Sequence, residues 1–185
     1  MLSNVPILLT LLRIILIPCF VGVFFLPVWW ANMACTALFG AAAITDLLDG
    51  YLARRLQQGS DFGAFLDPVA DKLMVAAALI LLVQAIPTPL VAIAAVIIIG
   101  REITISALRE WMAQLGSRTT VAVSMIGKFK TTAQMIALIF LLYRKPLGPF
   151  PTLEVGLGFL LIAAALTLWS MLHYLMVAWP VIMKR

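Results

Sequence analysis

Two pairs of aspartates stand close together in a chain that carries only eight acidic residues. Asp46 and Asp49 are three residues apart and Asp67 and Asp71 are four apart, so each pair lies on one face of a helix. The segment between the pairs is short, so two antiparallel neighbouring helices can bring all four carboxylates together. Four carboxylates in a partly dehydrated site repel one another strongly unless protons or cations lie between them. Because oxygen ligands suit hard cations, the spacing predicts a site for Mg²⁺ or Mn²⁺, with ligands enough for two ions.

Each aspartate also has a structural interpretation when it is taken alone. Asp67 precedes Pro68 and could cap a helix that begins at the proline. Either aspartate of the first pair could form an ion pair with Arg54 or Arg55 across a turn. Asp61 falls in the expected loop and is interpreted as a solvated turn residue. The four aspartates of the two pairs, taken together, favour the metal site.

The residues around the aspartates form a longer pattern, which reads Asp46-x-x-Asp49-Gly50-x-x-Ala53-Arg54, eight residues, Gly63-x-x-x-Asp67-x-x-x-Asp71. This pattern resembles the signature of the CDP-alcohol phosphotransferases at all of its fixed positions. The remainder of the chain, with "NVPILLTLLR" near its start and "GKFKTTAQ" further on, resembles bacterial members of that family whose acceptor is sn-glycerol 3-phosphate.

The resemblance implies a role for each matched residue. Asp46, Asp49 and Asp67 would bind a first metal ion. Asp46, Asp67 and Asp71 would bind a second, and Asp71 would also be the general base. The positions that hold the cytidine diphosphate part of CDP-diacylglycerol in the family correspond to Gly50, Arg54 and Ser60.

A second polar group is basic and comprises Arg101, Arg109, Arg118, Lys128 and Lys130. Arg101 and Arg109 are about two helical turns apart and share a face. Each is followed by a glutamate, but adjacent residues on a helix do not face each other, so no pairing is expected. Lys128 and Lys130 place donors at the start of a helix, which favours anions. We predict a cationic pocket for the phosphate of a small acceptor; the alternative is that these side chains reach to anionic lipid headgroups.

Four isolated residues carry less information. Arg13 lies nearly two turns inside the first apolar stretch, and it either points inward or extends to the membrane interface. His173 is the single histidine and is interpreted as structural or interfacial. Cys19 and Cys35 are interpreted as core residues, because a free cysteine packs as a small apolar side chain.

The composition of the chain indicates the class of protein that carries these charged groups. The chain has 185 residues, of which 64% are hydrophobic and 11% charged, with a mean hydropathy of +1.10. A soluble domain averages about 25% charged residues, so the fold class predicted is an all-α polytopic membrane protein, a single domain over residues 1–185. Each membrane-spanning helix needs about 20 mostly apolar residues. Six stretches meet this need: 7–28, 32–56, 64–86, 89–112, 120–143 and 153–178.

The cations sort by side of the membrane. Only Arg144 and Lys145 fall on one side, whereas all other loop and helix-end cations fall on the other. The positive-inside tendency then places both termini in the cytoplasm, with a polar cavity that faces the cytoplasm. No basic run with interleaved aromatic residues is present, so a nucleic-acid partner is not expected.

The resemblance implies an enzyme of the bacterial inner membrane, acting as a homodimer among membrane lipids. It would transfer the phosphatidyl group of CDP-diacylglycerol to sn-glycerol 3-phosphate and release CMP. One alternative is another member of the family, with serine, inositol phosphate or phosphatidylglycerol as acceptor. A second alternative, from a different class, is a cation-coupled transporter, since carboxylates within the membrane also mark ion pathways. A transporter would favour a repeated architecture, and the sequence has a single acidic cluster.

Overall fold

The computed structural model describes residues 5–56, 61–114 and 125–183. Its regular secondary structure in these residues is entirely helical, which confirms the all-α prediction. Each of the six helices overlaps its expected stretch, but the first ends four residues earlier, the third begins three residues earlier and the sixth ends five residues later than expected. They are α1 Val5–Phe24, α2 Ala31–Leu56, α3 Asp61–Ala85, α4 Pro89–Gln114, α5 Met125–Tyr143 and α6 Thr152–Met183.

The start of α3 corrects two expectations. Asp61 is the first residue of α3 and does not lie in a loop, and Asp67 and Pro68 lie inside the helix rather than at its beginning. The capping interpretation of Asp67 is therefore wrong. Proline lacks an N–H group and removes one helical hydrogen bond, a loss that neighbouring helices and polar side chains can compensate in a membrane protein.

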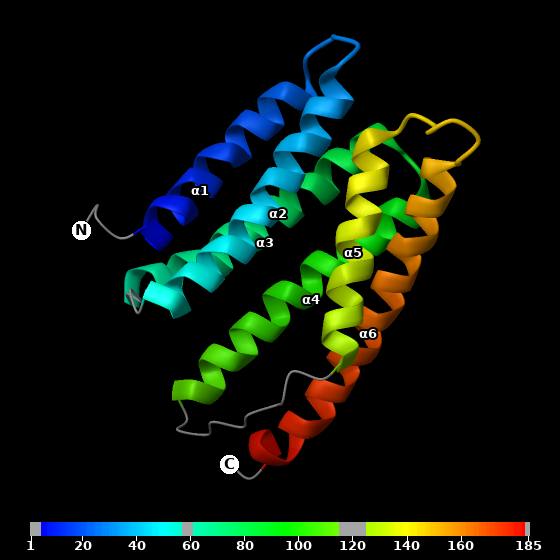
Figure 1. Cartoon of the computed structure of the whole chain (residues 1–185). Coiled ribbons are helices and arrows are strands. Elements are labelled where there is room, and N and C mark those ends of the chain that lie inside the picture. The colour runs from blue at the N-terminus through cyan, green and yellow to red at the C-terminus, as the bar shows by residue number, and fades with distance from the viewer. Residues whose placement is uncertain (1–4, 57–60, 115–124, 184–185) are drawn as a thin grey trace.

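The helices run back and forth along one bundle axis (Figure 1). α1 packs along α2 and α3, while α5 packs along α6, which also contacts α4. α2 contacts α5 and so joins the two groups. The start of α1 and the ends of α2, α4 and α6 lie at one end of the bundle, at the lower left of Figure 1, and the α1–α2 and α5–α6 connections lie at the other.

The core contains large aliphatic and aromatic side chains separated by alanines. Phe20, Phe39 and Leu138 are almost fully buried, and so are Ala78 and Ala137. Small residues let helices approach closely where burial of apolar surface gives no advantage over lipid. α5 and α6 approach each other closely at Gly156, where an added Cβ would lie 2.9 Å from Cγ of Leu141.

The outer surface is apolar. Val96 is 72% exposed and Trp29 is 76% exposed, and other large apolar side chains on every helix also face outward. Exposed apolar area on this scale marks a surface that lipid or another protein covers. Among the described residues, two helices are long and apolar enough to span a membrane on their own, Pro89–Met112 with mean hydropathy 2.0 and Thr152–Met176 with mean hydropathy 2.1.

Arg144 and Lys145 lie at the end of the bundle where the α1–α2 connection is found. Arg144 adopts the left-handed conformation with φ 58° directly after α5, and its guanidinium lies 5.0 Å from the centre of the Phe24 ring. Lys145 donates a hydrogen bond of 3.0 Å to the backbone oxygen of Trp29. Both cations therefore tie the end of α5 to the α1–α2 connection.

Candidate active site

A cavity of about 1120 Å³ opens between α2, α3, α4, α5 and α6. Its polar residues come from the second halves of α2, α4 and α6 and from the first halves of α3 and α5. Because the helices alternate in direction, these segments gather at the end of the bundle that holds the start of α1 (Figure 1). The charged residues of the lining are Asp46, Asp71, Lys72, Arg101, Glu102, Arg109 and Lys130.

Two of the four aspartates of the predicted site line the cavity, and a third lies outside its lining. Asp46 on α2 and Asp71 on α3 line the cavity directly. Asp67 is one turn before Asp71 and accepts a hydrogen bond from the hydroxyl of Thr10, a residue of α1 that is 1% exposed. The side chain of Asp49 lies outside the described residues. The predicted convergence of α2 and α3 is thus present for one aspartate from each helix.

Arg13 resolves the choice that the sequence left open, because it points inward. It is 1% exposed, and its Nη1 lies 2.8 Å from Oδ1 of Asp46. This ion pair comes from α1; the side chains of Arg54 and Arg55, the partners considered from sequence, lie outside the described residues. Thr10 and Arg13 are three residues apart and share a face of α1. Two polar residues on one face of an apolar stretch were a signal that could have identified α1 as the support of the aspartates.

The described side chains do not by themselves form a complete metal site. No group of three His, Cys, Asp or Glu residues lies close enough to hold one ion in the described part of the chain. The donor chemistry nevertheless fits a hard divalent cation, because Asp46 and Asp71 face the same cavity with carboxylate oxygens. The four-aspartate site remains a prediction that includes Asp49.

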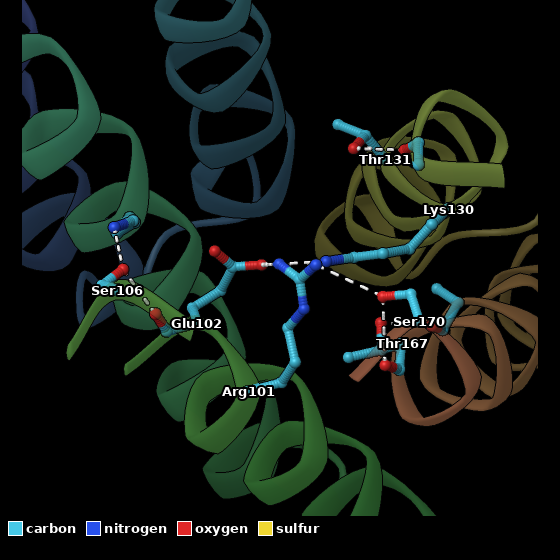
Figure 2. Close-up of polar contacts among 10 residues, drawn as sticks. Arg101, Glu102, Ser106, Lys130, Thr131, Thr167 and Ser170 are labelled. Carbon is cyan, nitrogen blue, oxygen red and sulfur yellow. Dashed lines mark hydrogen bonds and ion pairs between the residues drawn. The ribbon is translucent and has the colours of Figure 1, made fainter. Parts of the chain in front are cut away.

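Two cations of the predicted basic pocket meet at one carboxylate (Figure 2). Oε1 of Glu102 lies 2.8 Å from Nη1 of Arg101 and 2.8 Å from Nζ of Lys130. Nη2 of Arg101 also donates a hydrogen bond of 3.2 Å to Ser170 on α6. The expectation that Arg101 would not pair with its neighbour Glu102 is wrong. Both side chains are long enough to bend toward the same point, and Lys130 from α5 fixes that point.

The structure describes the contacts of some of the other basic residues and not those of others. Arg109 lines the cavity with Arg101, as their spacing predicted, and its guanidinium lies 5.5 Å from the centre of the Tyr174 ring. Lys72, which was not assigned to the pocket from sequence, donates a hydrogen bond to the hydroxyl of Ser106 on α4. Ser106 in turn donates to the backbone oxygen of Glu102 at 2.7 Å. Arg118 and the side chain of Lys128 lie outside the described residues.

α6 contributes lining residues that sequence reasoning missed. His173, interpreted as structural or interfacial, lines the cavity together with Trp169 and Tyr174. A single histidine in an apolar stretch gave no sign of which face it occupies. The positions matched to the donor nucleotide, Gly50, Arg54 and Ser60, have no described side-chain placement, so their roles remain predictions.

A helical bundle with an apolar exterior and a charged internal cavity defines a class, the helical membrane proteins. Within that class, the sequence profile of the CDP-alcohol phosphatidyltransferases matches residues 3–182. The match covers nearly the whole chain, and the chain belongs to this family. Its members are membrane proteins that generally use divalent metal ions.

Several proteins with similar sequences share the name CDP-diacylglycerol–glycerol-3-phosphate 3-phosphatidyltransferase. The protein of that name from Pseudomonas fluorescens is 56% identical over 178 residues, which cover 96% of this chain and 91% of the relative. The protein from Shigella flexneri serotype 5b is 56% identical over 176 residues, covering 95% and 94%. The protein from Escherichia coli K12 is 55% identical over 178 residues, covering 95% and 94%.

Proposed function

We propose that this protein transfers the phosphatidyl group of CDP-diacylglycerol to sn-glycerol 3-phosphate, giving phosphatidylglycerophosphate and CMP. The observation that carries the proposal is the similarity, at 55% to 56% identity over nearly the whole chain, to proteins named for this reaction. The cavity supports it independently, because carboxylates and cations line the same space and can serve a metal-bound diphosphate and a phosphorylated acceptor.

Asp71 is the base in the proposed reaction. Its carboxylate removes the proton from the primary hydroxyl of the acceptor, and that oxygen attacks the phosphorus that bears the diacylglycerol. The bond from this phosphorus to the bridging oxygen of the diphosphate breaks, and the electron pair leaves with CMP. Asp71 lines the cavity, so its carboxylate can meet an acceptor there.

The aspartates are also the proposed ligands of two Mg²⁺ or Mn²⁺ ions, with Asp46, Asp49 and Asp67 at the first and Asp46, Asp67 and Asp71 at the second. Bound divalent ions neutralise a diphosphate and stabilise the charge that develops on its leaving group. Thr10 and Arg13 hold Asp67 and Asp46 in fixed positions from the side of α1. A carboxylate whose rotamer is already fixed loses less freedom when it binds an ion.

The two substrates are assigned to different walls of the cavity. Gly50, Arg54 and Ser60 are proposed to hold the cytidine diphosphate part of the donor. The acceptor phosphate is proposed to bind the basic pocket formed by Arg101, Arg109, Arg118, Lys128 and Lys130. The described members of that pocket line the same cavity as Asp71, so an acceptor bound there can present a hydroxyl to the base.

We further propose that all six helices span the inner membrane of a bacterium, that both termini and the cavity face the cytoplasm, and that the chain forms a homodimer. The gathering of charged residues at the end of the bundle with the start of α1 supports this orientation. Cysteines introduced at Ser60 and Ser117 should react with reagents from the cytoplasmic side, and one at Thr88 from the opposite side. Labelling with the reverse sidedness would contradict the orientation.

The function is tested with purified protein, CDP-diacylglycerol, a divalent ion and a panel of acceptors, with CMP release as the measurement. We expect release with sn-glycerol 3-phosphate and much less with serine, inositol phosphate or phosphatidylglycerol. A preference for one of these other acceptors would keep the family chemistry and reject the acceptor. Absence of CMP release with every acceptor, from protein that remains folded, would reject transferase activity and leave the transporter alternative.

A further inference from the structure

Glu102 is an anion in a wall that otherwise collects cations. Its Oε1 accepts from Arg101 and Lys130 at 2.8 Å each, and Arg109 and Lys72 line the same cavity. A carboxylate in this place repels an acceptor phosphate, because like charges a few ångströms apart interact strongly in a partly buried site. A pocket that only had to bind phosphate would be stronger without it. Glu102 is therefore expected to serve another part of the acceptor.

The second oxygen of Glu102 is available for such a contact. Both cations bind Oε1, and Oε2 makes no hydrogen bond within the described ranges. Figure 2 shows this oxygen on the side of the carboxylate that faces away from Arg101 and Lys130. The Glu102 side chain is 28% exposed and lines the cavity, so a small molecule in the cavity can reach it.

Glu102 also lies between the two parts of the site that the acceptor must connect. It contacts Lys130 and Arg101 on one side. On the other side its backbone oxygen accepts a hydrogen bond from Ser106, and the Ser106 hydroxyl accepts one from Lys72, the residue next to Asp71. In a glycerol phosphate the secondary hydroxyl lies between the phosphate and the primary hydroxyl that reacts. With the phosphate at the cations and the primary hydroxyl at Asp71, the secondary hydroxyl falls near Glu102.

We propose that Glu102 determines specificity for the acceptor, with its Oε2 accepting a hydrogen bond from the secondary hydroxyl of a polyol phosphate while Oε1 holds Arg101 and Lys130. This inference rests on the proposed function of the cavity. Sites that hydrogen-bond a substrate hydroxyl discriminate strongly against analogues that lack it, because the buried polar group is then left unpaired. The carboxylate thus weakens the attraction for the acceptor phosphate but lets the site select acceptors that carry the secondary hydroxyl.

The experiment compares two acceptors, sn-glycerol 3-phosphate and 1,3-propanediol monophosphate, which lacks only the secondary hydroxyl. The full chain is assayed in detergent with CDP-diacylglycerol and a divalent ion. We expect the wild-type protein to favour glycerol phosphate in kcat/KM by at least about tenfold, the size of effect that a charged hydrogen bond gives. Glu102→Gln should lower kcat/KM for glycerol phosphate, and it should leave kcat/KM for the deoxy acceptor unchanged or raise it, because the variant no longer repels the phosphate; the preference is then lost.

Glu110→Gln is the matched control, because Glu110 is an exposed glutamate of the same helix and is not part of the cavity lining. It should keep the wild-type preference. An equal fall for both acceptors in Glu102→Gln would overturn the proposal and leave Glu102 as a residue that only positions the cations. Equal use of both acceptors by the wild-type protein would overturn it without any variant. In both cases the transfer to glycerol phosphate, and so the proposed function, would stand. Failure of the wild-type protein to use glycerol phosphate would reject both the proposed function and the role proposed for Glu102.

Discussion

The cavity has an acidic wall, formed by Asp46 and Asp71 on α2 and α3, and a basic wall, formed by Arg101, Arg109 and Lys130 on α4 and α5. The two walls balance their charges in different ways. Each wall collects charges of one sign, which repel one another when partly buried. The acidic wall takes its counter-charge from outside the cavity, where Arg13 of α1 binds Asp46. The basic wall takes its counter-charge from within, where Glu102 binds Arg101 and Lys130.

This difference indicates what each wall has to do. A counter-charge placed behind the carboxylates leaves their cavity side open to cations. A counter-charge placed among the cations reduces the attraction for phosphate but adds an acceptor of hydrogen bonds. We therefore expect changes to the acidic wall to affect turnover and changes to the basic wall to affect recognition of the acceptor.

The largest effect is expected from removal of the metal. EDTA should abolish CMP release, and Mg²⁺ or Mn²⁺ should restore it, because the acidic wall has too few cations of its own to neutralise a diphosphate. Full activity in buffer freed of divalent ions would show that the acidic wall works without metal. The interpretation that the carboxylates of the acidic wall are left open to bind cations would then be wrong.

Asp71→Asn should follow in size, with kcat lowered by at least about two orders of magnitude, since the variant retains the size of the side chain but not the proton acceptor. Binding of CDP-diacylglycerol should fall much less, because the remaining aspartates can still hold one ion. Turnover and equilibrium binding of the donor, measured on the same preparation, check both parts. A variant that loses donor binding as severely as turnover would assign Asp71 to metal binding alone.

Arg13→Gln tests the support behind the acidic wall. The Asp46 side chain is 41% exposed, so its loss of a partner is softened by water, and we expect a destabilisation of about 1–3 kcal/mol. Activity should fall by about tenfold as the aspartate loses its fixed position. Thermal unfolding in detergent and CMP release measure the two effects. Arg13→Lys keeps the charge and should recover part of both; recovery of neither would mean that the shape of the guanidinium decides, not its charge.

The smallest effects are expected in the basic wall. Lys130→Ala and Arg109→Ala should each raise KM for sn-glycerol 3-phosphate by about tenfold and change kcat less, because each removes one phosphate-pairing charge away from the reacting atoms. Arg54→Ala should instead raise KM for CDP-diacylglycerol. Acceptor kinetics unaffected by both basic-wall changes would mean that neither residue binds the acceptor phosphate.

The sequence could predict the helices and the two charged groups because both depend on short spacings. The apolar runs placed five of the six helices within a few residues at their starts, and the position of Asp71 near Asp46 follows from two helices with a short connection. Pro68 misled only the interpretation of Asp67 as a helix cap, since a proline is read locally as a boundary, whereas the neighbouring helices accommodate it inside α3.

The partners of the charged groups could not be predicted in the same way. Arg13 and Asp46 are far apart in sequence, and whether they meet depends on the rotation of α1 against α2. The pairing of Arg101 with Glu102 depends on a lysine contributed by another helix. His173 was missed because the facing side of α6 is set by packing and its sequence is apolar on every side.

The position of α1 has a consequence for how the protein is made. None of the described residues that line the cavity belongs to α1, yet Thr10 and Arg13 hold two of the aspartates. α1 leaves the ribosome before α2 and α3, which carry its partners. The acidic wall is therefore complete only after α1 has docked against α2 and α3, which are synthesised later. We therefore expect transferase activity to depend on the docking of α1 as well as on the residues that line the cavity.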